Sequence, residues 1–207
     1  IDDVISVGRA RRVLGGDVDL RLDANEAWDC DEVITRIQML EPFAPTCLEQ
    51  PVPHSQVHRL ADVKPCIATP IMLDESLCCE EDAQRAIAGR TCDLFNLRIS
   101  KCGGIIPCVR LAALARQHGL GYQLGCQVGE TGILSAAGRH FACNIGQIRY
   151  LEGSFDRFLV RGSVTKEDLT FCYGGRATRL GAAGLGITVN EAIIRHTAVR
   201  ELPLIGG

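Results

Sequence analysis

The sequence lacks the features that mark membrane, secreted and nucleic-acid-binding proteins. No apolar run reaches about 18 residues, so we expect no helix that spans a bilayer. No charged segment followed by an apolar stretch opens the chain, so we expect a cytoplasmic protein without a secretory signal. The formal net charge of −3 provides no basic surface for nucleic acid or an anionic membrane. The 207 residues, of which 46% are hydrophobic, are enough for one domain with a substantial core.

The cysteines lack the spacing of a zinc site or of a disulfide framework. None of the 11 cysteines belongs to a C-x₂-C pair, and most are scattered singly. Cys78 and Cys79 are adjacent in the chain, and such neighbours cannot form an ordinary disulfide. We therefore expect reduced and mostly buried thiols, as in other cytoplasmic proteins.

What the sequence does contain is a regular alternation of extended and helical segments. Patterns typical of strands recur about every 25 residues, over residues 18–23, 46–49, 71–74, 92–100, 121–127 and 148–153. Amphipathic patterns typical of helices lie between them. This alternation predicts a parallel sheet, and its uniform period favours a (β/α) barrel over a doubly wound sheet. After Phe158 the chain becomes rich in glycine.

Three acids and a lysine follow successive predicted strands. Asp23, Glu49 and Asp74 are 26 and 25 residues apart, and Lys101 follows 27 residues later. In a barrel the carboxyl ends of the strands meet at one mouth, where three carboxylates would repel each other without a cation. Hard oxygen ligands favour Mg²⁺, with Mn²⁺ as the alternative. Lys101 would then be placed to move a proton, although each acid taken alone could simply cap the helix that follows it.

Four neighbouring residues are candidates to support this site or to bind substrate. Asn25 and Glu75 closely follow two of the acids in the sequence. Asn96 and Arg98 are two residues apart, so they share one face of their predicted strand. If that face is the barrel interior, Arg98 is buried and needs an acidic partner, either Glu75 or the acid that precedes it.

Two further candidates lie in predicted loops. Gly103, followed by Gly104, could offer backbone N–H groups to an anionic substrate group at a helix start. A tight turn that requires positive φ explains this pair equally well. Glu130 follows the predicted strand at 121–127, where it could orient substrate, relay a proton or cap the next helix.

Four motifs, taken in order, give the chain a family resemblance. Asp-Ala-Asn, Leu-Glu-Gln-Pro, Leu-Asp-Glu-Ser and Lys-x-Gly-Gly resemble the enolase superfamily, and within it the muconate lactonizing enzyme subgroup, from Ile1 to about Gly153. The resemblance implies a modified (β/α) barrel capped by a separate α+β domain. It also implies that Asp23, Glu49 and Asp74 bind the metal and that Lys101 is an acid and base. No histidine closes a predicted strand, as the base of the mandelate racemase subgroup would.

The resemblance covers only part of that family pattern. The Lys-x-Lys of the subgroup would fall before residue 1, as would the first two barrel strands and the capping domain. We therefore expect residues 1–160 to form a partial barrel, about strands three to eight. We expect residues 161–207 to be a C-terminal segment that returns toward the capping domain. The edges left by the missing strands need a cover.

The implied activity is Mg²⁺-dependent removal of an α-proton from a small carboxylate substrate through an ene-diolate. Isomerisation is the expected result, by a cycloisomerase or by a racemase or epimerase. β-Elimination, as in o-succinylbenzoate synthase or an acid-sugar dehydratase, uses the same residues. A catalytically inactive fragment, or a structural subunit that completes a barrel with another chain, is the third alternative.

The resemblance also bears on partners and on one acid near the end of the barrel. The expected partners are the carboxylate substrate, the capping domain and further copies of the chain in a homo-oligomer. Asp156 could meet a substrate ammonium, as acids at this place do in dipeptide epimerases. The match is loose, because those enzymes resemble Asp-x-Asp and this chain has Ser-Phe-Asp.

Overall fold

The computed structural model describes residues 2–153 and 156–200 and contains the predicted parallel sheet. Six strands follow one another in chain order across the sheet. They are β1 (Arg21–Asp23), β2 (Cys47–Glu49), β3 (Ile71–Leu73), β4 (Leu94–Leu97), β5 (Gly121–Leu124) and β6 (Tyr150–Leu151). The first four strands pair in parallel with their neighbours. The expected partial barrel is thereby confirmed, with strands shorter than the sequence pattern suggested.

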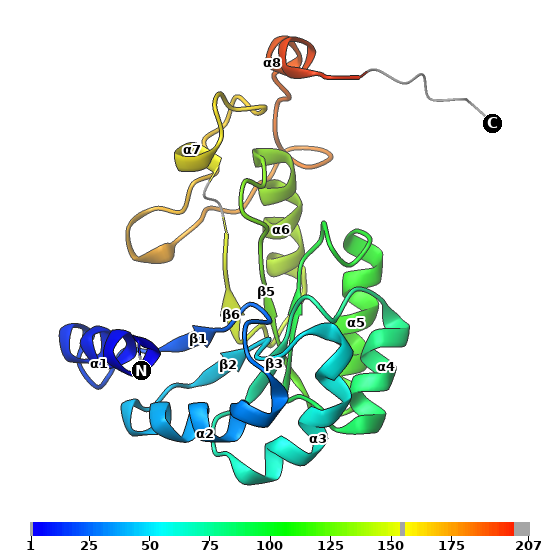
Figure 1. Ribbon diagram of the computed structural model, residues 1–207. Helices are drawn as coiled ribbons and strands as arrows, with labels where there is room; N and C mark the ends of the chain where they lie inside the picture. The colour runs from blue at the N-terminus through cyan, green and yellow to red at the C-terminus, as the bar shows by residue number, and fades with distance from the viewer. Residues whose placement is uncertain (1, 154–155, 201–207) are drawn as a thin grey trace. The chain divides into compact units, whose positions relative to one another are not determined.

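Helices separate the strands, as the alternation of patterns predicted. They are α1 (Asp2–Leu14), α2 (Cys30–Leu40), α3 (Leu60–Val63), α4 (Glu80–Gly89), α5 (Ile105–Gln117), α6 (Gly132–Asn144), α7 (Asp156–Leu159) and α8 (Glu191–Thr197). Short 3₁₀ helices are η1 (Glu41–Phe43), η2 (His54–Arg59), η3 (Lys64–Cys66) and η4 (Tyr173–Gly175). Helices α2 to α5 lie to one side of strands β1 to β4 (Figure 1). None of the helices in the described ranges is both long and apolar enough to cross a membrane.

The chain divides into two compact units, which are described separately. The first comprises Ile1–Gln123 with Gln147–Tyr150, and the second comprises Leu124–Gly146 with Leu151–Gly207. The boundary near residue 160 that the sequence suggested stays a prediction.

Helix α2 illustrates how the sequence builds the first unit. The Asp29 carboxylate accepts a hydrogen bond of 3.0 Å from the backbone N–H of Asp31, so it caps the helix. Val33 and Ile37 are fully buried one helical turn apart. Burying each such side chain contributes about 1.5–3 kcal/mol. This apolar face fixes the helix against the sheet and leaves the strand ends free for polar residues.

The strand register determines which side chains share a face of the sheet. Asp23 pairs with Glu49, and Glu49 pairs with Met72 in the next strand. Met72 in turn pairs with Leu94. Met72 and Leu94 form a buried apolar layer with Cys47, against which Tyr150 packs. Side chains alternate along a strand, so the residue two places after Cys47, Met72 or Leu94 points to the same side of the sheet. These residues lie at the carboxyl ends of their strands.

The second unit is built around α6 and the segment that follows β6. Arg139 in α6 is buried, and its guanidinium donates hydrogen bonds to the backbone oxygens of Leu169 and Thr178. Gly132 begins the helix so close to Thr165 that a Cβ there would lie 2.4 Å from the Thr165 Oγ1. A side chain at this position would therefore force Thr165 to shift.

Candidate active site

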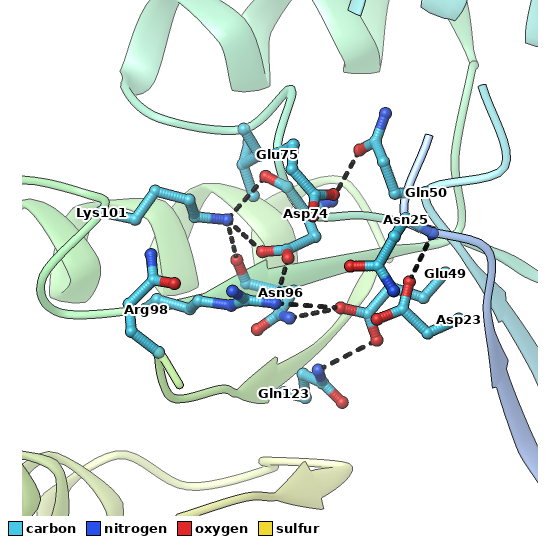
Figure 2. A network of polar contacts seen from close by, with 12 residues as sticks. Asp23, Asn25, Glu49, Gln50, Asp74, Glu75, Asn96, Arg98, Lys101 and Gln123 are labelled. Carbon is cyan, nitrogen blue, oxygen red and sulfur yellow. Dashed lines mark hydrogen bonds and ion pairs between the residues drawn. The ribbon is translucent and has the colours of Figure 1, made fainter. Parts of the chain in front are cut away.

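Two of the three predicted acids are buried at neighbouring strand ends. Glu49 closes β2 with 4% of its surface exposed, and Asp74 directly follows β3 with none exposed. Buried carboxylates are costly unless charged or polar partners compensate them. Figure 2 shows that several polar side chains of the first unit provide this compensation.

Glu49 receives donors on both carboxylate oxygens. Asn96 Nδ2 donates to Oε1 at 2.5 Å, and Arg98 Nη2 lies 3.7 Å from the same oxygen. Gln123 Nε2 lies 3.4 Å from Oε2. Asn96 and Gln123 are themselves fully buried, so their amide groups are held in place by the surrounding core.

Asp74 is held by two cations. Arg98 forms an ion pair with its Oδ2, and Lys101 Nζ lies 2.6 Å from its Oδ1. Asp74 is thus one of the two partners expected for Arg98 from the sequence. Charge-assisted contacts of this kind fix both the place and the direction of the carboxylate.

Lys101 points into the same cluster. Its amine donates to Asp74 O at 2.6 Å and to Asn96 O at 3.0 Å, in addition to the Asp74 carboxylate, and its side chain is 9% exposed. The chain turns sharply after Arg98, since the N–H of Lys101 bonds back to the Arg98 carbonyl. Gly103 has φ +85°, in the left-handed region that favours glycine, so a tight turn accounts for it structurally.

Asp23 and Glu75 are acids of the same cluster, and the pKa of each carboxyl is raised. Desolvation raises the pKa of the Asp23 carboxyl above its usual range, and the charge of Asp74 adds to this, although the Asn25 N–H donates to Asp23 Oδ1 at 2.9 Å. Desolvation also raises the pKa of Glu75, followed by the charges of Asp74 and Asp23. Asp23, Asp74 and Glu75 are therefore close enough to repel each other.

Three residues of the cluster were not singled out from the sequence. Gln50 and Gln123 are fully buried, and Arg21 donates through Nη1 to Gln123 Oε1. The Arg21 guanidinium also stacks over the Tyr150 ring, 4.6 Å from its centre. A polar residue inside an apolar strand is the signal that could have indicated Gln123, and Gln50 directly follows Glu49 in the quoted motif.

Glu130 and Asp156 belong to the second unit and are described within it. The Glu130 carboxylate accepts a hydrogen bond of 3.0 Å from the N–H of Gln127, so it folds back on its own loop. Asp156 begins α7, and its buried Oδ1 has no hydrogen-bond partner among the described residues. Their roles stay predictions.

The donor set fits a hard divalent cation. Asp23 and Glu49 end neighbouring parallel strands and Asp74 directly follows the next one, and hard oxygen ligands suit Mg²⁺. Two buried acceptors beside them, Glu75 Oε2 and Asn96 Oδ1, lack a hydrogen-bond partner in the part of the chain that is described. Within that part, no group of three or more His, Cys, Asp or Glu side chains is arranged as a metal site. Asp74 is instead turned to Arg98 and Lys101.

The fold and this cluster define a class of protein: a parallel β/α barrel portion with acids and a lysine at the carboxyl ends of its strands. Within this class, the family model for "Enolase C-terminal domain-like" matches residues 2–193. The chain therefore belongs to this family, as its four sequence motifs predicted.

Known relatives of the chain include an epimerase and a racemase. The chain is 32% identical over 190 residues to a hydrophobic dipeptide epimerase of Enterococcus faecalis, covering 90% of this chain and 52% of that protein. It is 29% identical over 202 residues to an N-succinyl-L-Arg/Lys racemase of Bacillus cereus, covering 96% and 53%. The chain thus spans about half the length of the curated relatives it matches.

Solved structures agree with this assignment. The dipeptide epimerase of Cytophaga hutchinsonii, in complex with Mg and the dipeptide D-Ala-L-Val, superposes with a TM-score of 0.86 at 28% identity, covering 94% of this chain and 52% of that one. A muconate lactonizing enzyme superposes with a TM-score of 0.85 at 27% identity, covering 94% and 54%. One of these two structural neighbours thus contains bound Mg.

Proposed function

We propose that the intact protein containing this chain removes a proton from the carbon next to a substrate carboxylate, and returns it, with Mg²⁺ as cofactor. The product would be the opposite stereoisomer, so the protein would be a racemase or epimerase. The observation that carries the proposal is the Lys101 amine, 2.6 Å from the Asp74 carboxylate in a cluster of acids. A proton carrier beside cation ligands is what this reaction needs.

Asp23, Glu49 and Asp74 are the proposed Mg²⁺ ligands. When bound, Mg²⁺ would stabilise the negative charge that develops on the substrate carboxylate as the proton leaves. Asn96 and Gln123 would keep Glu49 in position, since each donates to one of its oxygens. These contacts restrict the carboxylate before any ligand arrives, which reduces the cost of ordering it.

Lys101 is the proposed acid and base. As a base its uncharged Nζ would take the α-proton while the electrons of the broken C–H bond remain on the substrate. As an acid its ammonium would deliver a proton to the same face of that carbon, so inversion needs a second proton carrier on the opposite face, proposed to be a lysine of the Lys-x-Lys segment outside this chain. Its Nζ forms a direct ion pair with Asp74 Oδ1 at 2.6 Å, so the amine is held beside the proposed metal ligands.

Specificity and assembly extend the proposal beyond the described cluster. Gly103 and Glu130 are proposed to contact substrate, and Asp156 is proposed to meet a substrate ammonium. Asn25 and Glu75 are proposed to support the acids that precede them. A capping domain outside this chain would close the site, and the intact protein is proposed to form a homo-oligomer.

β-Elimination remains a second candidate. The chain is 31% identical over 173 residues to the o-succinylbenzoate synthase of Thermobifida fusca, covering 84% of this chain. Both reactions begin with loss of the α-proton, so the same acids and lysine serve either. They differ in whether a leaving group departs from the next carbon, and the product distinguishes them.

Proton exchange in heavy water tests the proposal. The intact protein with Mg²⁺ should incorporate deuterium at the α-carbon of a dipeptide or N-acyl amino acid substrate, and chelation should stop it. Lys101→Ala should lose exchange from at least one stereoisomer, and Lys101→Arg should fail similarly, because a guanidinium does not deprotonate a carbon acid at neutral pH.

A matched control separates catalysis from folding. Lys64 also pairs with an acid, Asp93, at 2.7 Å and donates to a backbone oxygen, but it lies outside the cluster. Lys64→Ala should retain exchange. Exchange from both stereoisomers in Lys101→Ala at the wild-type rate would refute the role of Lys101, and an unsaturated product without exchange into recovered substrate would favour elimination.

A further inference from the structure

We infer that Gln50 is a positioning residue that sets the direction of the Asp74 carboxylate toward the cation. The inference rests on the proposed function, because it gives Asp74 the role of a Mg²⁺ ligand. Gln50 directly follows Glu49, and its side chain is fully buried. That side chain bonds to backbone groups and to the Ser76 hydroxyl, so it would act on the Asp74 carboxylate indirectly, through the loop that carries it.

The side-chain oxygen of Gln50 holds the loop after β3. Gln50 Oε1 accepts hydrogen bonds from Asp74 N at 2.9 Å, from Ser76 N at 3.3 Å and from Ser76 Oγ at 2.8 Å. Its Nε2 donates to Val52 O at 2.8 Å. Because oxygen and nitrogen each have a matching partner, the amide cannot turn over without losing hydrogen bonds at both ends. The loop is therefore held in one position relative to β2.

The backbone of Gln50 also forms hydrogen bonds with the other segments that carry the acids. Its N–H donates to Met72 O at 2.9 Å, and its carbonyl accepts from Glu26 N at 2.8 Å. Gln50 has φ +33°, a conformation that residues other than glycine rarely adopt. Such a conformation persists only where the surroundings enforce it, and it is common at functional sites. One residue thus joins the strand ends that carry Asp23, Glu49 and Asp74.

The hydrogen bonds that fix the Asp74 backbone also include one from Lys101. Asp74 O accepts from the Lys101 amine at 2.6 Å and from Leu77 N at 2.9 Å. A rotation of the Asp74 peptide would therefore move the Asp74 carboxylate together with the Asp74 carbonyl oxygen, which accepts from the Lys101 amine. Figure 2 shows Gln50 on the opposite side of Asp74 from Lys101, as this chain of contacts requires. Gln50 is the fixed end of that chain.

A purely structural role would predict a different outcome, and Gln56 offers a matched control. Gln56 Oε1 accepts from Cys30 N at 2.7 Å, and Gln56 Nε2 donates to Asp29 Oδ2 at 3.0 Å. It therefore makes the same kind of contacts as Gln50, but at the start of α2 and away from the cluster. Methionine is similar in size to glutamine but has no amide group. Replacing buried Gln50 or half-buried Gln56 by methionine therefore removes these hydrogen bonds with little change in volume.

The test is Mg²⁺ affinity of the intact protein, measured by titration calorimetry with the metal alone. Gln50→Met should bind Mg²⁺ about 10- to 100-fold more weakly, the effect typical of residues that orient metal ligands. Gln56→Met should bind like wild type even if it melts at a lower temperature. Equal Mg²⁺ affinity in Gln50→Met and Gln56→Met would overturn the inference.

A milder variant covers the case in which Gln50→Met does not fold. Ser76→Ala removes one of the three hydrogen bonds to Gln50 Oε1 and leaves the two backbone N–H groups in place. It should weaken Mg²⁺ binding by a smaller factor, and unchanged affinity in this variant would overturn the inference. If wild type binds Mg²⁺ and these variants bind it equally well, the positioning role of Gln50 is refuted and the proposed function is not. A wild-type protein that binds none refutes the proposed function as well.

Discussion

At the scale of single residues, Arg98 supplies positive charge to both buried acids of the site. Its Nη2 forms an ion pair with Asp74 and lies 3.7 Å from Glu49 Oε1, while its own side chain is only 14% exposed. In such a place the attraction and the desolvation of the charges nearly cancel, but removing one partner leaves the other charge uncompensated. Asp74 and Glu49 therefore depend on Arg98 whenever no metal is bound.

Arg98→Met should destabilise the metal-free protein by about 3–5 kcal/mol, the usual cost of breaking a buried ion pair. Added Mg²⁺ should recover part of the loss, because a ligand that binds only the folded state stabilises it. Urea unfolding with chelator and with Mg²⁺ measures both effects. Arg85→Met is the control: Arg85 is 70% exposed, and its partner Asp82 keeps hydrogen bonds from two backbone N–H groups without it, so the loss should be below about 1 kcal/mol.

Cys92 gives a prediction about pH at the same scale. Desolvation raises the pKa of its thiol to about 12 from the ordinary 9.0. In the unfolded chain the thiol loses its proton near pH 9, whereas in the folded protein it keeps the proton until about pH 12. The folded state therefore binds more protons between these values, and the free energy of unfolding must fall as the pH rises through this window.

The effect should reach about 1.4 kcal/mol for each pH unit within the window. The measurement is the free energy of unfolding of wild type and of Cys92→Ala at pH 8 and pH 10.5, and the decrease should be smaller in the variant. Alkylation of the folded protein at pH 8 is a second check, since exposed Cys66 and Cys143 should react and buried Cys92 should not. Equal labelling of all three would contradict the burial of Cys92.

At the scale of the elements, α6 owes its position to one close contact. A Cβ at Gly132 would lie 2.4 Å from the Oγ1 and 2.9 Å from the Cγ2 of Thr165, which is shorter than atoms tolerate. A Cβ at Gly138, in the same helix, would have its nearest neighbour at 3.6 Å, an ordinary contact with Leu124. The two glycines thus differ in what surrounds them, although both belong to one helix.

Gly132→Ala should cost about 1–3 kcal/mol through this overlap. Gly138→Ala should be neutral or stabilising, because alanine favours a helix over glycine by about 1 kcal/mol. Adding Thr165→Ala should recover part of the loss in Gly132→Ala. The measurement is thermal unfolding of wild type, of the single variants Gly132→Ala and Thr165→Ala, and of the double variant, which together form a double-mutant cycle. Additive effects of the two substitutions would show that the contact does not determine the position of α6.

At the scale of the whole molecule, the sheet has an edge that the described residues leave open. Strand β1 is first in the sheet order and pairs only with β2 within the described ranges. An open edge offers unpaired backbone groups to other chains. The curated relatives are about twice as long as this chain, and we propose that strands outside residues 1–207 cover the edge.

Residues 1–207 produced alone should therefore self-associate, whereas the intact protein should form a defined species. Gel filtration with light scattering distinguishes these results. Leu22→Lys, in the centre of β1, should reduce the association of the isolated chain, because a charge on an edge strand opposes pairing. A soluble monomer of residues 1–207 that melts cooperatively would contradict the expectation.

The sequence by itself determined the alternation of elements and the place of four candidate site residues. Apolar runs of strand length, separated by amphipathic helices, allow few folds other than a parallel β/α arrangement. Asp23, Glu49 and Asp74 follow such runs directly, and Lys101 follows the next, so their common edge could be predicted from spacing alone. Local patterns suffice here because the burial of apolar residues fixes the period of each element.

Only the tertiary structure decided which polar groups meet one another at that edge. Gln123 is distant in the chain from Glu49 and Arg21, and it contacts both because strand register brings it there. Gln50 adopts a left-handed backbone that its sequence does not demand, because hydrogen bonds from the loop after β3 hold it. Such contacts depend on the pairing of strands far apart in the sequence, and a one-residue shift in register would turn every side chain to the other face.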